Sequence, residues 1–242
     1  MLISCKRQRG MALILVLWLL AVLSLVVTGV VATQRVESRQ SHAELQRSKA
    51  VVAAEGGLSL AIHELLRAPE SFLANGQTYS ATVDGVMLAL SIRSEHGKLD
   101  LNFGNLDYFA HFFRAMGASP AEADALVSRM RTRRDLGEPL QHLEDLLVVT
   151  SMDIALYQRI LPYVTLWGGD GVPVADFADP VLRKAIGLPK AQQKNGNPGS
   201  VVSIDVQATL ADGFSAGLLA TVQITEEGGE AGVFKVLRWQ ER

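Results

Sequence analysis

A glycine-flanked serine near the C-terminus is the first pattern in this chain that could do chemistry. Residues 213–217 read Gly-Phe-Ser-Ala-Gly, the G-x-S-x-G arrangement that presents a nucleophilic serine, here Ser215. Such a serine needs a strand before it, a helix after it, and an acid and then a histidine later in the chain. Asp212 and Gly213 predict a turn between two strands instead, and no histidine follows His142. We therefore expect a loop turn here and no hydrolase activity.

Histidines and the cysteine give no metal or catalytic constellation. The 5 histidines lack the H-E-x-x-H spacing or any other ligand spacing, and the single cysteine, Cys5, excludes disulfides and cysteine metal sites. We expect the histidines to be solvated or to cap helices. The sequence thus predicts a protein that is not an enzyme.

A run of arginines in the middle of the chain raises the question of nucleic-acid binding. Clustered basic side chains bind phosphate backbones, but this cluster is followed at once by acidic residues, and the net charge of the chain is −2. The arginines are Arg129, Arg131, Arg133 and Arg134. A solvated helix face is the favoured interpretation, with an acidic protein partner and DNA as alternatives. We expect no nucleic-acid partner.

The N-terminus carries the strongest pattern. Lys6, Arg7 and Arg9 precede Gly10, and the 22 residues from Met11 to Ala32 contain no charge. A helix of that length spans roughly 33 Å, enough to cross a bilayer core, and the basic end would stay inside. The sequence therefore predicts a single-pass membrane anchor.

Four kinds of processing compete for this leader. A secretory signal peptide would be cut after a shorter apolar region, near Ala32, and a lipoprotein would need Cys5 after that region rather than before it. An anchor that is never cut is a third alternative. The favoured one is a prepilin-like leader, in which a peptidase cuts between Gly10 and Met11 and leaves the apolar helix at full length.

Periodicity predicts an α+β fold behind this anchor. Apolar residues at helical spacing extend the first helix to about Arg67, and Gly56 and Gly57 weaken its middle. Strands are expected at 79–83 and 86–93, joined by an Asp84-Gly85 turn, and again at 201–206, 217–225 and 233–239, with a loop over 226–232. Residues 104–188 are predicted to be helical, with a capping box at Ser119 and Glu122 and a helix capped by Asp179.

Several of these segments resemble one family, the K-type minor pseudopilins of type II secretion systems (general secretion pathway protein K). The resemblance covers nearly the whole chain and is carried by residues 7–13, 95–102, 139–146, 157–164, 171–175, 180–182 and 236–239. Leu15 stands at the fifth residue after Gly10, where most pilins carry a glutamate; the K type also lacks this acid. Asp100 stands where asparagine is commoner in the family, and the asparagines usual around 171–175 are absent.

The resemblance implies a pilin-like fold: a long N-terminal transmembrane and amphipathic helix packed on an antiparallel sheet, with an inserted all-helical domain. The predicted segments are a leader (1–10), the transmembrane part (11–32) and the amphipathic part (33–68) of the helix, the first part of the sheet (69–97), the helical domain (98–189), and a linker with the last part of the sheet (190–242). It implies cleavage by prepilin peptidase and N-methylation of Met11. It also implies bound calcium, for which Asp170, Asp176 and Asp179 are weak candidate ligands.

The function implied is a non-enzymatic one at the tip of the secretion pseudopilus in the bacterial inner membrane, with the C-terminal domain in the periplasm. There the protein would assemble with the I- and J-type minor pseudopilins and the inner-membrane secretion platform, initiate or cap the pseudopilus, and support export of folded proteins. The alternative is an uncleaved, membrane-tethered binding module whose helix-hairpin-helix-like part binds nucleic acid or a cell-envelope partner.

Overall fold

The computed structural model describes residues 8–67, 74–192, 198–229 and 232–242; the side chains of residues 8–12, 29–33, 35–36 and 226–233 also lie outside the description. The chain divides into two compact units, Met1–Lys49 and Ala50–Arg242. Each unit is described by itself.

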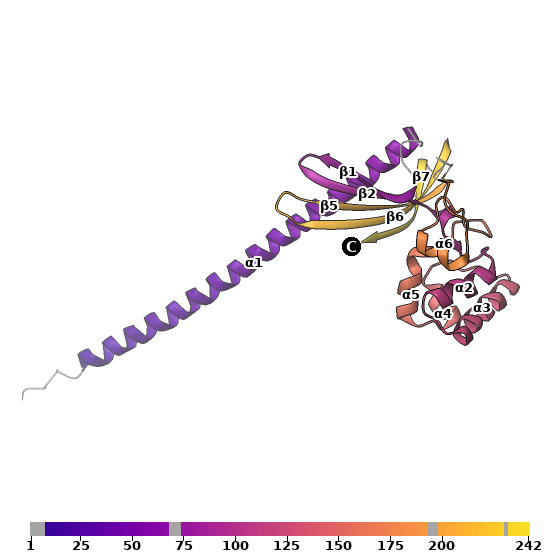
Figure 1. The fold of residues 1–242 in the computed structure, drawn as a ribbon. Coiled ribbons are helices and arrows are strands. Elements are labelled where there is room, and N and C mark those ends of the chain that lie inside the picture. Colours follow the sequence, from indigo (N-terminus) through magenta and orange to yellow (C-terminus); the bar gives the residue numbers. More distant parts are fainter. Residues whose placement is uncertain (1–7, 68–73, 193–197, 230–231) are drawn as a thin grey trace, which may run out of the picture. The chain divides into compact units, whose positions relative to one another are not determined.

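Helix α1 runs from Gln8 to Arg67 and so passes through both units (Figure 1). In the first unit, the described apolar side chains from Leu13 to Val27 are exposed. Among the described residues, no helix combines the length and apolar character needed to cross a membrane. The transmembrane span predicted over 11–32 is therefore not confirmed, and both ends of that span carry side chains outside the description.

In the second unit, the end of α1 packs on a sheet through the apolar stripe that the sequence predicts. Ala50, Ala54, Leu58, Ala61 and Leu65 are all buried, because helical spacing places them on one face. Val36 and Ala43 continue the same spacing toward the N-terminus and were predicted to belong to this stripe. Ala43 is exposed, and the side chain of Val36 lies outside the described residues.

The sheet has five antiparallel strands in the order β1-β2-β5-β6-β7. The strands are β1 (Asn75–Val83), β2 (Val86–Ser94), β5 (Val201–Thr209), β6 (Ser215–Gly229) and β7 (Gly232–Glu241). Asp84 and Gly85 join β1 to β2 with φ of 50° and 79°, the positive values of a tight two-residue hairpin turn. The loop predicted over 226–232 was wrong, because β6 continues to Gly229 and β7 starts at Gly232.

Alternation along the strands divides the sheet into two faces. Residues such as Leu90, Ile204, Val206 and Ala220 form a hydrophobic core with α1. Their neighbours in the chain point to the opposite face, because successive side chains of a strand alternate. Several of those neighbours, including Ser91, Arg93, Ser203 and Asp205, are polar.

Within the described ranges, the helices other than α1 lie in the chain between β2 and β5, which pair with each other (Figure 1). They are α2 (Leu106–Ala115), α3 (Pro120–Asp135), α4 (Asp145–Thr150), α5 (Ile154–Ile160) and α6 (Pro180–Ile186). Short turns η2 (Glu95–Gly97) and η3 (Leu161–Tyr163) and a small parallel pair, β3 (Leu99–Asp100) with β4 (Val164–Thr165), complete this part.

The helical part has its own hydrophobic core. Its centre is a group of phenylalanines on α2, Phe109, Phe112 and Phe113, all fully buried. Local signals start and end the helices as the sequence predicts: Ser119 and Glu122 form the capping box of α3, and α6 lies between the Asp179 cap and Gly187 in the left-handed region. The fold is thus α+β with an antiparallel sheet, as expected, while the boundaries 98–189 of an inserted domain stay a prediction.

Candidate functional site

The polar face of the sheet, opposite α1, opens into a cleft of about 380 Å³. Its other wall comes from the helical part of the same unit. The lining residues are Ser91, Arg93, Glu95, Lys98, Leu143, Leu161, Pro162, Tyr163, Val164, Trp167, Asp179, Ser203, Asp205, Leu219, Thr221, Arg238, Gln240 and Arg242. A volume of this size lies within the range of small-molecule sites, about 300–1,000 Å³.

Strand register builds the polar wall. Arg93 on β2 stands opposite Ser203 on β5, Ser203 stands opposite Thr221 on β6, and Thr221 stands opposite Arg238 on β7. Four strands that are neighbours in the sheet therefore contribute one cross-strand row, in which two hydroxyls lie between two arginines. The next row along the strands places Asp205 between Ser91 and Leu219.

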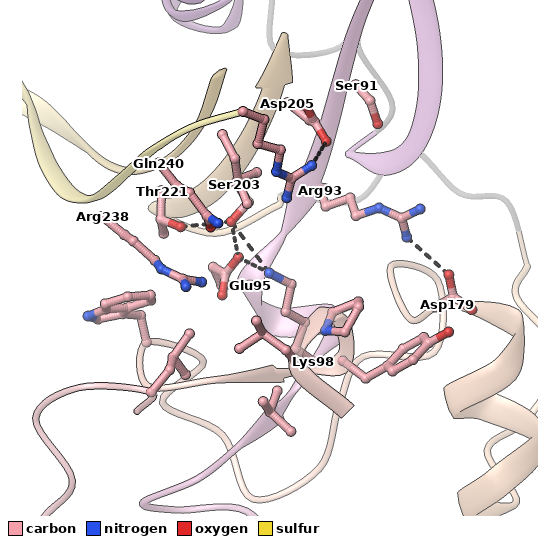
Figure 2. A pocket seen from close by; sticks show the side chains of 18 residues that line it. Ser91, Arg93, Glu95, Lys98, Asp179, Ser203, Asp205, Thr221, Arg238 and Gln240 are labelled. Carbon is pink, nitrogen blue, oxygen red and sulfur yellow. Dashed lines mark hydrogen bonds and ion pairs between the residues drawn. The ribbon is translucent and has the colours of Figure 1, made fainter. Parts of the chain in front are cut away.

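A buried ion pair closes one side of the row (Figure 2). Glu95, in the turn that follows β2, is only 1% exposed, and its carboxylate contacts Lys98 Nζ at 2.5 Å. Ser203 Oγ donates to the same carboxylate oxygen, and it also lies 2.9 Å from Thr221 Oγ1. A buried carboxylate needs such partners, because an unpaired charge inside a protein is strongly unfavourable.

The other cations of the cleft pair at its rim. Arg93 contacts Asp179 at 3.2 Å, and Arg242 contacts Asp205 at 3.1 Å. Arg238 contacts Glu144 at 3.5 Å, and the Glu144 side chain is 62% exposed. The lining residues therefore comprise four cations and three carboxylates, which leaves a small positive excess.

An aromatic residue adds a neutral polar group to this wall. Burial, and then the nearby Asp179 carboxylate, raise the pKa of Tyr163, so its phenol stays protonated at neutral pH. The lining contains no histidine or cysteine. Ser203 Oγ lies 3.4 Å from Lys98 Nζ, but it donates to Glu95, so its geometry serves binding and packing rather than attack on a substrate.

The sequence-predicted leader residues belong to the first unit. Gly10 and Met11 are within helix α1, while Lys6 and Arg7 and the Arg9 side chain lie outside the described residues. Leu15 is exposed on α1. Cleavage at Gly10 and methylation of Met11 stay predictions.

The candidate calcium ligands are not gathered into one site. Asp170 lies 3.5 Å from His96, Asp176 accepts a hydrogen bond from the backbone of Gln192, and Asp179 both caps α6 and pairs with Arg93. Within the described ranges, no three His, Cys, Asp or Glu side chains converge in a way that could hold a metal ion. Calcium binding stays an untested prediction.

The two remaining sequence patterns have structural roles. Ser215 begins β6 directly after a turn at Gly213, so the G-x-S-x-G segment is a hairpin with a strand after the serine. Arg134 donates to the carbonyls of Leu101 and Gly104 and Arg129 donates to that of Thr150, so these two arginines help to hold α3 in place. Arg129 and Arg131 are exposed, as expected of a solvated helix face.

Sequence reasoning missed the cleft itself. The sequence predicted strands at 201–206 and 217–225 but did not indicate which strands would be neighbours. Only that pairing brings Arg93 and Arg238 into one row.

Comparison with known proteins shows a likeness of fold. No family model and no curated protein matches this sequence. Among solved structures, the chain is similar to a chain of the GspK-GspI-GspJ complex from the type 2 secretion system of enterotoxigenic Escherichia coli. The identity is 11%, the TM-score is 0.56, and the match covers 84% of this chain and 99% of that chain. The likeness is one of fold, and it agrees with the GspK-like resemblance seen in the sequence.

Proposed function

We propose that this protein is a K-type minor pseudopilin that acts at the tip of a type II secretion pseudopilus. The observation that carries the proposal is the fold likeness to a chain of a GspK-GspI-GspJ complex, which extends over 99% of that chain. The same match covers 84% of this chain. Its agreement with the leader pattern, found independently in the sequence, supports the same family.

The N-terminal pattern supplies the proposed route to the membrane. After cleavage between Gly10 and Met11, the uncharged segment to Ala32 would anchor the protein in the inner membrane, with the rest in the periplasm. Leu15 replaces the usual pilin glutamate. A carboxylate inside a membrane is unfavourable unless it is paired, for instance with the N-terminal amine of a neighbouring subunit. A subunit at the end of the filament has no need of that pair.

The proposed role is mechanical. The protein would assemble with I- and J-type minor pseudopilins, as the GspK-containing complex does, and cap or initiate the pseudopilus that supports export of folded proteins. The secretion platform would be its partner in the inner membrane. Calcium in the helical part remains part of the proposal, with its ligands unassigned.

The first test is the mass of the mature N-terminus. The full-length chain is expressed in cells with and without prepilin peptidase. It is then extracted from the membrane and analysed by intact mass and N-terminal peptide mapping. We expect a chain that begins with N-methylated Met11 only when the peptidase is present. A Gly10→Asp variant is the control and should stay uncut. A Met1 start in both samples, or a cut near Ala32, would contradict the proposal.

A second test addresses partners. Co-expression with I- and J-type minor pseudopilins should give a complex that co-purifies and elutes as one species. DNA is the probe for the alternative, a tethered binding module. A salt-sensitive DNA shift together with no complex would favour that alternative; the engagement of Arg129 and Arg134 with backbone carbonyls argues against it.

A further inference from the structure

The cleft has two chemically different walls. The sheet side presents Arg93, Ser203, Thr221 and Arg238 in one cross-strand row. The side from the helical part combines the carboxylate of Asp179 with a group of mainly apolar residues, Leu143, Leu161, Pro162, Tyr163, Val164 and Trp167. A ligand that matched both walls would carry a polar head and an apolar body.

The charges that line the cleft indicate which polar head a ligand would carry. The lining cations Arg93, Lys98, Arg238 and Arg242 outnumber the lining carboxylates Glu95, Asp179 and Asp205. A guanidinium presents five N–H donors in a planar fork that matches a carboxylate, so one ion pair does not saturate it. An anionic head therefore suits this wall.

Arg238 is the lining cation that its carboxylate partner holds most loosely. Its partner Glu144 is not part of the cleft lining, is largely exposed, and contacts it at 3.5 Å, the longest of the four pairs that these cations make with Asp or Glu. An ion pair at this distance, with a carboxylate largely open to solvent, contributes little stability. Figure 2 draws no bond from Arg238 to another lining residue, although Thr221 and Gln240 lie beside it.

We propose that this cleft binds a carboxylate attached to an apolar body, with the carboxylate on Arg238 and the body against the wall that includes Leu143 and Trp167. The volume of about 380 Å³ accommodates a group the size of one or two amino-acid residues. Both a free carboxylic acid and the last residue of a peptide offer this chemistry. The inference concerns the cleft alone and does not rest on the pseudopilin assignment.

The test uses the full-length chain and two pairs of probes. The first pair is N-acetyl-phenylalanine and its uncharged primary amide; the second is Ala-Ala-Phe with a free C-terminal carboxylate and the same peptide amidated. Binding is measured by isothermal titration calorimetry at low and at physiological salt. We expect at least one acid to bind and its amide to bind at least tenfold more weakly. Higher salt should lower the affinity for the acid.

Matched variants locate the site. Arg238→Gln should reduce acid binding tenfold or more, and Arg238→Lys, which keeps the charge but loses the fork, should fall in between. Arg131→Gln removes the same charge from an exposed position on α3 outside the cleft lining and should leave binding unchanged. Circular dichroism checks that each variant is folded.

Each outcome decides the proposal. Binding of both acids supports a small-molecule source, and binding of the peptide acid alone supports a protein C-terminus. Equal affinity for acid and amide, equal loss in Arg238→Gln and Arg131→Gln, or no binding of either acid would overturn it.

Discussion

Gly57 of α1 faces Val206 of β5 so closely that a Cβ on this glycine would stand 2.7 Å from Val206 Cγ1. A Cβ on Gly56, its neighbour in the helix, would have no atom within 4 Å apart from the adjoining residues and the backbone of the helix itself. One glycine of the pair therefore lets the helix approach the sheet, while the other faces open space. The contact explains why a helix interior tolerates glycine at 57.

The two glycines predict opposite effects of the same substitution. Gly57→Ala should lower the free energy of unfolding by about 1–3 kcal/mol, because the methyl group overpacks the helix–sheet core. Gly56→Ala should raise it by about 1 kcal/mol through helix propensity. Urea denaturation of the full-length variants measures both. Equal effects of the two substitutions would mean that α1 does not approach the sheet at Gly57.

The second prediction concerns the stability of a variant at Asp100, a position where the family that this chain resembles usually carries asparagine. Its Oδ1 accepts from the backbone N–H groups of Asn102 and Phe103, and its Oδ2 accepts from Gly169 N–H at 2.9 Å. In Asp100→Asn the amide nitrogen would face the Gly169 N–H, donor against donor. We expect a loss of about 1–3 kcal/mol in the free energy of unfolding.

The control for that substitution is Asp107→Asn, an isosteric change at an exposed position in the first turn of α2. It should change the free energy of unfolding by less than about 1 kcal/mol. If Asp100→Asn were as mild as this control, the 168–171 loop would have to be held by other contacts.

The buried Glu95–Lys98 pair predicts non-additivity. Glu95→Gln should destabilise by about 2–4 kcal/mol, because it leaves the Lys98 ammonium without its partner in a site where it is 16% exposed. The double variant Glu95→Gln, Lys98→Met should lose at least about 1 kcal/mol less free energy of unfolding than the sum of the losses in the two single variants. A double-mutant cycle by urea denaturation gives the coupling.

The exposed Arg114–Asp124 pair is the reference for that cycle. There, Asp124→Asn should change the free energy of unfolding by less than about 1 kcal/mol, because solvent screens the pair. Purely additive effects of the Glu95 and Lys98 substitutions would be inconsistent with a coupled buried pair.

The hydrogen bonds of Asp145 predict that the free energy of unfolding depends on pH. Hydrogen bonds from the backbone N–H groups of His142 and Gln141 hold the pKa of this carboxyl below its ordinary value of 3.8. The unfolded chain then binds the proton more tightly than the folded one, so the contribution of Asp145 is present above the unfolded pKa and is lost as pH falls through the folded pKa.

Asp145→Ala tests this sign. The variant should be less stable than the original chain by about 1 kcal/mol near pH 6, where the carboxylate accepts both bonds. The difference should shrink as the pH drops below the ordinary pKa of the carboxyl, because protonation removes the same interaction from the original chain. Denaturation midpoints measured across this pH range give the comparison, and a constant difference would contradict the argument.

The sequence by itself determined the features that depend on neighbours along the chain. The buried stripe from Ala50 to Leu65, the Asp84-Gly85 turn, and the capping box at Ser119 all follow from spacing or from the conformational needs of single residues. Each needs contacts only a few positions apart, so local physics is sufficient. The leader pattern is of the same kind, and its consequences remain predictions.

Tertiary structure alone decided which distant residues meet. Arg93 and Arg238 share a row because β5 and β6 lie between β2 and β7, a pairing order that alternation within one strand does not encode. Asp179, expected to cap a helix, also pairs with Arg93 across 86 positions of the chain. Alternation fixes the face on which a side chain lies, but only strand order and register fix its neighbours, because those depend on how the entire core packs.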